Sequence, residues 1–156
     1  MEEPQELAEA ISTAADAGGR RIAVVESLTG GLVSSDLAAS PGSSEWFRGG
    51  VVAYDRVTKH GVLGVPDGPV VAEPAVRAMA ERAAGMFDAD LAVAVSGAGG
   101  PDPQDDQPPG TVWLAVVDRG ETTTWVCHFP GDPGEVLRLT RSEALRALRD
   151  HLEPAR

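Results

Sequence analysis

The chain has 156 residues, of which 42% are hydrophobic, and its 24 acidic and 13 basic residues give a formal net charge of −11. This length and apolar content fit one globular domain over residues 1–156 that buries a core of its own. The acidic balance disfavours a nucleic-acid partner and an anionic membrane surface, because both require a positively charged face.

Other features of the sequence bear on the compartment and on metal binding. The single cysteine, Cys127, lies in an alternating segment and has no partner for an internal disulfide, which favours a reducing compartment. The N-terminal MEEPQELAEA lacks the pattern of a signal peptide, and no run of the sequence approaches the 18 apolar residues of a membrane span. We therefore expect a cytoplasmic protein. His60, His128 and His151 are scattered, so the sequence predicts no metal site.

The predicted elements alternate between helices and strands in the first half of the chain. Residues 5–17 place apolar side chains on one helical face and end at a glycine pair, and residues 20–26 then predict a short buried strand. Residues 32–40 favour a helix, residues 49–54 a second strand, and residues 55–65 a short helix or turn.

The second half contains a helix, a nearly all-apolar strand, an irregular loop rich in glycine and proline, two alternating strands and a final helix: residues 72–87, 89–95, 96–110, 111–117, 122–129 and 133–153. The two alternating strands surround a short DRGE turn and predict an antiparallel hairpin. The whole order favours a three-layer α/β/α domain with a mixed, mostly parallel sheet and a C-terminal hairpin and helix.

Two glycine-rich turns follow predicted parallel strands, where ligands of such sheets collect. Residues 26–31 (ESLTGG) precede a predicted helix whose free amide groups could hold an anion. The alternative is an ordinary turn in which Thr29 caps the helix. Residues 96–100 (SGAGG) match no dinucleotide-binding fingerprint, so this turn alone is weak evidence of a site.

Residues 42–65, GSSEWFRGGVVAYDRVTKHGVLGV, concentrate potentially reactive side chains. A lysine that loses its charge in a closed pocket could activate a serine, with a tyrosine passing the proton between them. In the alternative interpretation Ser43 or Ser44 caps a turn, Tyr54 ends a strand, and Lys59 is solvated. The residues alone leave both interpretations open.

Four motifs occur in the order and approximate spacing of the competence/damage-inducible protein CinA C-terminal family: ESLTGG, GSSEWFRGGVVAYDRVTKHGVLGV, AVSGAGGP and PPGTVWLAV. The sequence resembles this family over residues 7–150. The resemblance implies a three-layer α/β/α domain, often a homodimer, that works without a metal or other cofactor. It also implies an amidohydrolase that converts the small molecule nicotinamide mononucleotide to its nicotinate form and ammonia.

Matching by motif implies a catalytic set of Ser44, Tyr54 and Lys59, in which Lys59 acts on the serine through Tyr54. The residues that the resemblance places on the ligand side are Glu26, Ser27, Thr29, Gly30, Gly31, Ser96, Gly97 and Gly100. We expect the substrate phosphate at the helix N-terminus near Thr29 to Gly31, with help from Arg48, and the oxyanion at backbone amides of a glycine-rich turn.

The chain departs from the family pattern in three places. Leu28 stands where cysteine is common, which excludes a thiol mechanism there, and Ser96 stands where threonine is common. Asp102, Asp105 and Asp106 form an acidic loop that would repel an anionic substrate unless these side chains point outward. Two other functions therefore stay open: an amidase for another small carboxamide, and a nucleotide-binding module without turnover.

Overall fold

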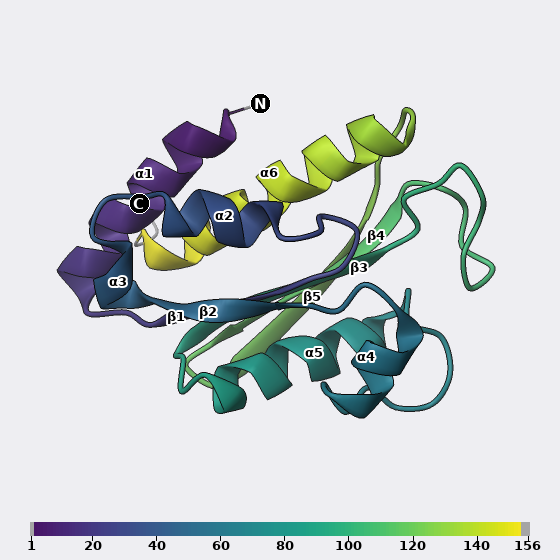
Figure 1. The fold of residues 1–156 in the computed structure, drawn as a ribbon, viewed down its shortest axis with the longest axis horizontal. Helices are drawn as coiled ribbons and strands as arrows, with labels where there is room; N and C mark the ends of the chain where they lie inside the picture. Colours follow the sequence, from purple (N-terminus) through teal and green to yellow (C-terminus); the bar gives the residue numbers. More distant parts are fainter. Residues whose placement is uncertain (1, 154–156) are drawn as a thin grey trace.

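The structure is a computed structural model that describes residues 2–153 (Figure 1). The elements in chain order are α1 (Pro4–Gly18), β1 (Ile22–Glu26), α2 (Leu32–Ala38), α3 (Ser43–Trp46), β2 (Phe47–Val52), α4 (Arg56–Gly61), α5 (Glu73–Met86), β3 (Leu91–Gly97), β4 (Thr111–Asp118), β5 (Glu121–His128) and α6 (Pro133–Leu152). Every predicted helix and strand is confirmed. The short helix α3 replaces a predicted turn, and β2 begins two residues earlier than the sequence indicates.

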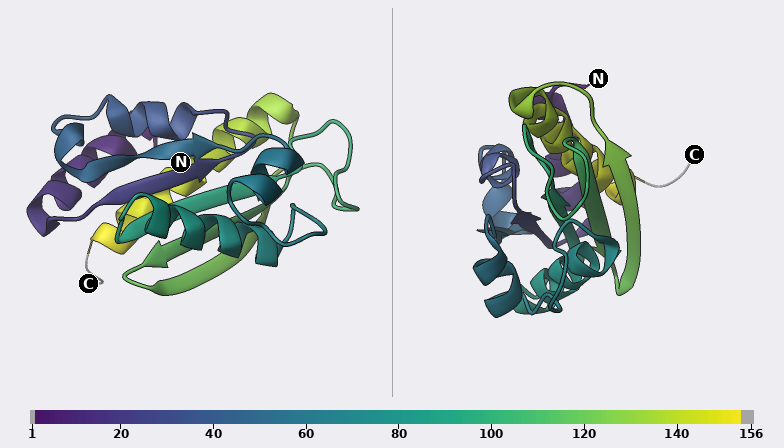
Figure 2. Two further views of the ribbon diagram at one scale, coloured as in Figure 1. Left: turned by 60° about the horizontal axis from the view of Figure 1, so that its bottom comes forward. Right: turned by 90° about the vertical axis from the view of Figure 1, so that its right-hand side faces the viewer.

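The sheet confirms the predicted three-layer α/β/α arrangement. Its five strands lie in the order β2-β1-β3-β4-β5, and β1 pairs in parallel with both β2 and β3. The hairpin strand β4 is antiparallel to β3 and to β5, so the sheet is mixed. Helices α1, α2 and α6 cover one face, and α4 and α5 cover the other (Figures 1 and 2).

Alternation of side chains along β1 divides the core into two clusters. Ile22 and Val24 pack with α1, α2 and α6, whereas Ala23 and Val25 pack with α5 and the segment that follows α4. Because successive side chains of a strand point to opposite faces, Glu26 is directed to the α2 side and Ser27 to the α4 side. The end of β1 thus supplies one polar side chain to each layer.

The carboxyl ends of the three parallel strands lie together at one edge of the sheet. Glu26 at the end of β1 pairs with Val52 at the end of β2, and β3 ends beside them at Gly97. All seven residues of β3 are buried, as its apolar sequence predicts. This edge carries the turn after β1, the segment leading into α4 and the long loop between β3 and β4 (Figure 1).

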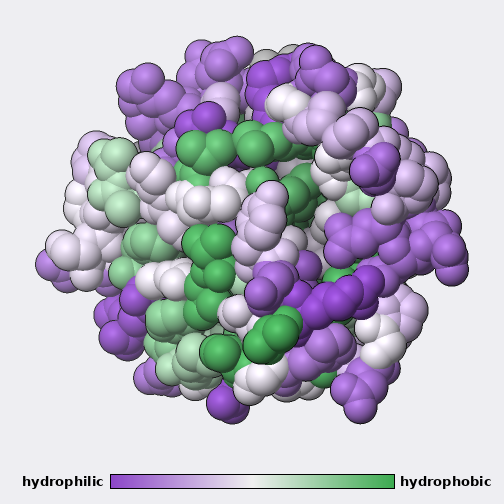
Figure 3. Space-filling view, turned by 45° about the vertical axis from the view of Figure 1, so that its right-hand side comes forward, coloured by the Kyte–Doolittle hydropathy of each residue, from purple (hydrophilic) through white to green (hydrophobic). Residues whose placement is uncertain are grey.

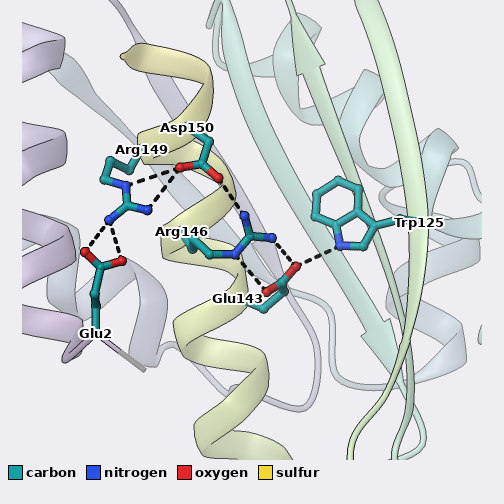
Figure 4. Close-up of polar contacts among 6 residues, drawn as sticks. All are labelled: Glu2, Trp125, Glu143, Arg146, Arg149 and Asp150. Carbon is teal, nitrogen blue, oxygen red and sulfur yellow. Dashed lines mark hydrogen bonds and ion pairs between the residues drawn. The ribbon is translucent and has the colours of Figure 1, made fainter. Parts of the chain in front are cut away.

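Helix α6 is fixed to its surroundings by polar contacts along one side (Figure 4). The six side chains involved are Glu2, Trp125, Glu143, Arg146, Arg149 and Asp150. Trp125 on β5 donates its Nε1 hydrogen to Glu143 at 3.0 Å, which ties the edge strand to the helix.

Within residues 2–153, no helix is both long and apolar enough to cross a membrane.

A buried arginine holds the opposite end of the sheet together. The Arg20 side chain is 7% exposed and contacts the carboxylates of Asp90, before β3, and Asp118, at the end of β4. His151 on α6 also contacts Asp118, with 3.0 Å between its Nδ1 and the carboxylate. Burial by itself raises the pKa of Asp90, but hydrogen bonds from the Arg21 amide and the Arg20 guanidinium outweigh it and hold this pKa below its usual 3.8.

Arg20→Ala is expected to lower the free energy of unfolding by about 2 kcal/mol at neutral pH, because it leaves two partly buried carboxylates without their shared counterion. The folded-state pKa of Asp90 lies below the unfolded value, so its contribution is present above pH 3.8 and is lost as the pH falls further. Urea unfolding at pH 7 and pH 3 measures both effects. Arg138→Ala, at an exposed pair, is the matched control, and an equal loss in both variants would contradict the prediction.

Candidate active site

Lys59 is a buried basic residue on the short helix α4, at the opposite end of the sheet from Arg20. Its side chain is 1% exposed, and its Nζ lies 3.0 Å from Ser27 Oγ. Asp55 fixes the start of α4 by accepting a hydrogen bond from the Thr58 amide at 2.9 Å. The sequence has one lysine, and all its other basic residues apart from histidine are arginines. Because lysine can lose its proton when buried and arginine cannot, the residue type at position 59 matters for the chemistry of the site.

The surroundings of Lys59 favour its neutral form. Burial is the largest influence and lowers the pKa of Lys59 from its ordinary 10.5, and the positive charge of Arg56 lowers it further. The carboxylates of Asp105 and Asp55 act in the opposite direction without restoring the ordinary value. A lysine whose pKa is depressed by desolvation can act as a general base toward a neighbouring hydroxyl.

The contact partner of Lys59 is Ser27, a residue that the sequence assigned to the ligand side. Ser27 follows the last residue of β1 and is 3% exposed. The predicted relay placed Tyr54 between Lys59 and Ser44, whereas in the structure Lys59 contacts Ser27 directly. Extending the alternation of β1 by one residue would have indicated that Ser27 faces the α4 layer.

Tyr54 lies at the mouth of a cavity beside this pair. Its side chain is 71% exposed, and it is the one tyrosine of the sequence. The cavity has a volume of about 290 Å³ and is lined by Ser27, Leu28, Tyr54, Gly97, Gly99, Gly100, Asp102, Pro103 and Gln104. This end of the molecule is turned forward in Figure 3, where hydrophobic side chains form a strip beside hydrophilic ones.

The structure does not bring Ser44 or Arg48 to this cavity. Ser44 is exposed on α3, before β2, whereas Tyr54 and Lys59 follow β2. Six residues of strand span about 20 Å, so Ser44 lies at the opposite edge of the sheet from Lys59. Arg48 is the second residue of β2 and is exposed near that same edge. The motif register alone suggested Ser44, and the length of the strand separates it from the other two members.

The expected anion site at the start of α2 is filled by a side chain of the protein. The Glu26 carboxylate accepts hydrogen bonds from the amides of Gly31, Val33 and Ser34 at 3.2, 2.9 and 2.8 Å. A substrate phosphate would have to displace a fully buried carboxylate from these donors. The amides of Gly31, Val33 and Ser34 are therefore not free for the phosphate that was expected near Thr29 to Gly31.

The remaining residues of the first turn support its shape. The Gly30 amide donates to the Ser27 carbonyl oxygen at 3.0 Å, and Gly31 adopts φ 106°, a conformation that side-chain-bearing residues rarely take. Thr29 does not cap α2. Its Oγ1 is buried and has no hydrogen-bond partner among the described residues.

The second glycine-rich turn forms the wall of the cavity facing Ser27. A Cβ at Gly99 would lie 3.8 Å from Leu28 Cδ1, so the two turns are in contact. Position 97 must be a glycine, because a Cβ there would come within 2.7 Å of Val112 Cγ2. Ser96 points away from the cavity and donates its hydroxyl to the Val70 carbonyl oxygen at 2.6 Å. Gly97 and Gly100 thus line the cavity, and Ser96 supports it from behind.

Two larger cavities and the single cysteine are poorer candidates for an active site than the cavity beside Lys59. Cavities of about 540 and 710 Å³ adjoin α1 and α6, and their charged side chains include pairs such as Asp36 with Arg141. Burial, reinforced by Glu143, raises the pKa of Cys127 to about 11, so its reactive thiolate is scarce at neutral pH. The cavity beside Lys59 combines an opening, a buried base and a hydroxyl, and we take it as the candidate active site.

The fold and the site define a three-layer α/β domain with a buried lysine–serine pair at the carboxyl edge of its parallel strands. The sequence profile of the CinA C-terminal domain matches residues 4–152, and the chain belongs to this family. Two crystal structures with similar folds are a competence or damage-inducible protein from Enterobacter asburiae and a CinA superfamily protein from Klebsiella pneumoniae. Their TM-scores are 0.93 and 0.91 at 30% and 32% identity, covering 98% and 97% of this chain and 100% and 98% of theirs.

Curated relatives differ in length and in name. The nicotinamide-nucleotide amidohydrolase PncC of Shigella flexneri is 38% identical over 153 residues, which cover 94% of this chain and 93% of that protein. A CinA-like protein of Mycobacterium tuberculosis is 39% identical over 138 residues, or 84% of this chain and 32% of the relative. The chain spans 27% to 33% of the length of the first curated relatives it matches.

Lys59→Met is expected to leave the melting temperature unchanged or to raise it, because methionine removes a buried basic group at similar volume. The folded-state pKa of Lys59 lies below the unfolded 10.5, so the cost of burial is present below pH 10.5 and disappears as the pH rises toward that value. Any gain in stability should thus be larger at pH 7 than at pH 10. Calorimetry at both pH values measures it.

The control for this measurement is Leu63→Ala, which truncates a side chain that is 1% exposed just after α4. It should cost about 2–5 kcal/mol through loss of buried apolar contacts. A comparable loss in Lys59→Met would show that the lysine stabilises the fold.

Proposed function

We propose that the domain is a serine amidohydrolase that converts nicotinamide mononucleotide to nicotinate mononucleotide and ammonia, with Ser27 as nucleophile. The observation that carries this proposal is the buried contact of 3.0 Å between Lys59 Nζ and Ser27 Oγ beside an open cavity. The name of the Shigella flexneri relative, which aligns over nearly all of both chains, supports the substrate. Such an enzyme would recycle pyridine nucleotides.

Neutral Lys59 accepts the hydroxyl proton of Ser27 as Oγ bonds to the carboxamide carbon. The resulting ammonium then returns a proton to the departing nitrogen, which leaves as ammonia, and an acyl-enzyme ester remains. Lys59 next takes a proton from a water molecule that attacks this ester, and returns that proton to Ser27 Oγ as the acyl C–O bond breaks. The product leaves as a carboxylic acid, and its proton passes through solvent to the released ammonia. Water is consumed, and Ser27 and Lys59 return to their starting states.

The second glycine-rich turn and Tyr54 also border the cavity, and their positions suggest a role for each in the reaction. The glycine-rich turn at Gly97 to Gly100 faces Ser27 across the cavity, and its backbone amides are our candidates for holding the oxyanion. Tyr54 is at the mouth of the cavity, so we assign it to contact with the substrate ring instead of proton relay. In this proposal Ser27 replaces Ser44 as the nucleophile.

Ser27→Ala should reduce ammonia release from nicotinamide mononucleotide by at least about 1000-fold, because the variant lacks the atom that forms the acyl-enzyme. Ser44→Ala, an equally small change at the other edge of the sheet, should retain nearly full activity. A coupled ammonia assay on both variants, with circular dichroism to verify folding, measures the difference. The reverse result would make Ser44 the nucleophile and refute our assignment.

The charge of the cavity favours a second candidate function, hydrolysis of a small carboxamide that lacks a phosphate. Among the described residues that line the cavity, Asp102 is the acidic one and there is no basic one, and a carboxylate attracts a pyridinium ring but repels a phosphate. The α2 N-terminus, the predicted phosphate site, is filled by Glu26.

Nicotinamide mononucleotide is expected to give a higher kcat/KM than nicotinamide riboside or nicotinamide if the mononucleotide is the substrate. Asp102→Asn should then lower KM for the mononucleotide by removing a charge that repels its phosphate, whereas KM for the riboside should stay unchanged or rise. Initial rates of ammonia release for the three compounds measure this order. A clear preference for the riboside would instead support the second candidate.

A further inference from the structure

The loop between β3 and β4 ends in a tight hairpin that the sequence does not reveal. Gln104 and Gln107 exchange backbone hydrogen bonds of 3.1 and 2.9 Å. The two residues between them, Asp105 and Asp106, have φ values of 52° and 61°, as in a two-residue turn of type I′. Asp tolerates this conformation better than most residues. The hairpin extends the segment that forms the loop wall of the cavity.

Asp105 anchors this hairpin to the layer that contains Lys59. Its carboxylate accepts hydrogen bonds from the amides of Val70 and Val71 at 2.9 and 3.0 Å and contacts the Arg56 guanidinium. The Asp105 side chain is 7% exposed, whereas Asp106 is exposed. The acidic loop therefore directs the Asp105 carboxylate into fixed contacts with the α4 layer, and of its three aspartates only Asp102 lines the cavity.

The anchoring point is shared with β3. Val70 donates its amide to Asp105 and accepts the Ser96 hydroxyl at its carbonyl oxygen. The end of β3 and the tip of the hairpin are thus both tied to one short segment. Because Asp105 supplies the acceptor for two amides, replacing it by alanine would leave two partly buried donors unpaired.

Arg56 connects this anchor to the base. It precedes Lys59 by three residues on α4, so the two side chains lie on neighbouring positions of one helical face. The charged groups acting on Lys59 are Arg56 and Asp55 from α4 and its cap, and Asp105 from the hairpin; Ser27 contacts it from β1. Arg56 and Asp105 neutralise each other, and each also acts on Lys59 with opposite sign.

We propose that Arg56 and Asp105 are a positioning pair for this site, which fixes the loop wall of the cavity and balances the charge around Lys59. The inference rests on the proposed function, in which Lys59 is the base. The pair does not touch the reacting atoms. It acts through Lys59 and through the wall that carries Asp102, Pro103 and Gln104.

Removing either member of the pair should shift the pKa of Lys59, and the two shifts should have opposite signs. Asp105→Asn removes the negative charge that favours the ammonium form and frees the charge of Arg56, so the pKa of Lys59 should fall. Arg56→Gln removes the positive charge and leaves Asp105 unopposed, so the same pKa should rise. A purely structural pair would lower activity in both variants without opposite shifts.

The experiment measures kcat/KM for ammonia release from nicotinamide mononucleotide between pH 5 and pH 10. The acid limb should move to lower pH in Asp105→Asn and to higher pH in Arg56→Gln, each by on the order of half a pH unit or more. The double variant should lie near the wild-type limb. Asp106→Asn is the matched control, because it removes the same charge from the adjacent exposed residue of the turn and should leave the profile unchanged.

A second readout does not depend on activity. Protein labelled with [ε-¹³C]lysine gives the signal of Lys59 alone, since the sequence has one lysine, and its chemical shift against pH reports the pKa directly. Opposite shifts in this titration would support the pair even if no substrate were hydrolysed, in which case the proposed function would fail. Unchanged or parallel shifts in folded Asp105→Asn and Arg56→Gln would overturn the inference, whether or not deamidation occurs.

Discussion

The alternation of side chains at the end of β1 is the constraint on which both the scaffold and the site depend. Glu26 points to one face and occupies the amides at the start of α2, and Ser27 points to the other and meets Lys59. The two roles require opposite properties. Glu26 is an acceptor saturated by backbone donors, whereas Ser27 borders a cavity. A shift of one residue in the register of β1 would exchange these faces and destroy both arrangements.

The burial of Lys59 lowers the stability of the fold and, at the same time, makes its amine easier to deprotonate. Desolvation disfavours the charged form that lysine adopts in water, so the fold must compensate elsewhere, and the close packing of the two apolar clusters offers the means. The short helix α4 holds the lysine at a place where apolar side chains would be more stable. Sites of this kind, in which local stability is given up for reactivity, are typical of catalytic centres.

The fold could be predicted from the sequence because its elements are locally encoded. The apolar run of β3, the amphipathic helices and the DRGE turn each specify their structure within a few residues. Of the three expected catalytic residues, Tyr54 lines the cavity and Lys59 contacts the lining residue Ser27. Ser44 was assigned by motif register alone, although it precedes the predicted strand that Tyr54 ends. The filled start of α2 and the inward turn of Asp105 depend on contacts between distant segments, to which local patterns are blind.

The presence of a single lysine gives the protein an unusual surface chemistry. Its exposed cations are guanidinium groups, and its one ε-amino group is enclosed between β1 and α4. A lysine-selective acylating reagent can reach that amine in the folded protein only when α4 separates locally from the sheet. Under conditions where this separation is faster than acylation, the rate of labelling is proportional to the population of the opened state. The rate of labelling at this one ε-amino group therefore reports the population in which this edge of the domain is open.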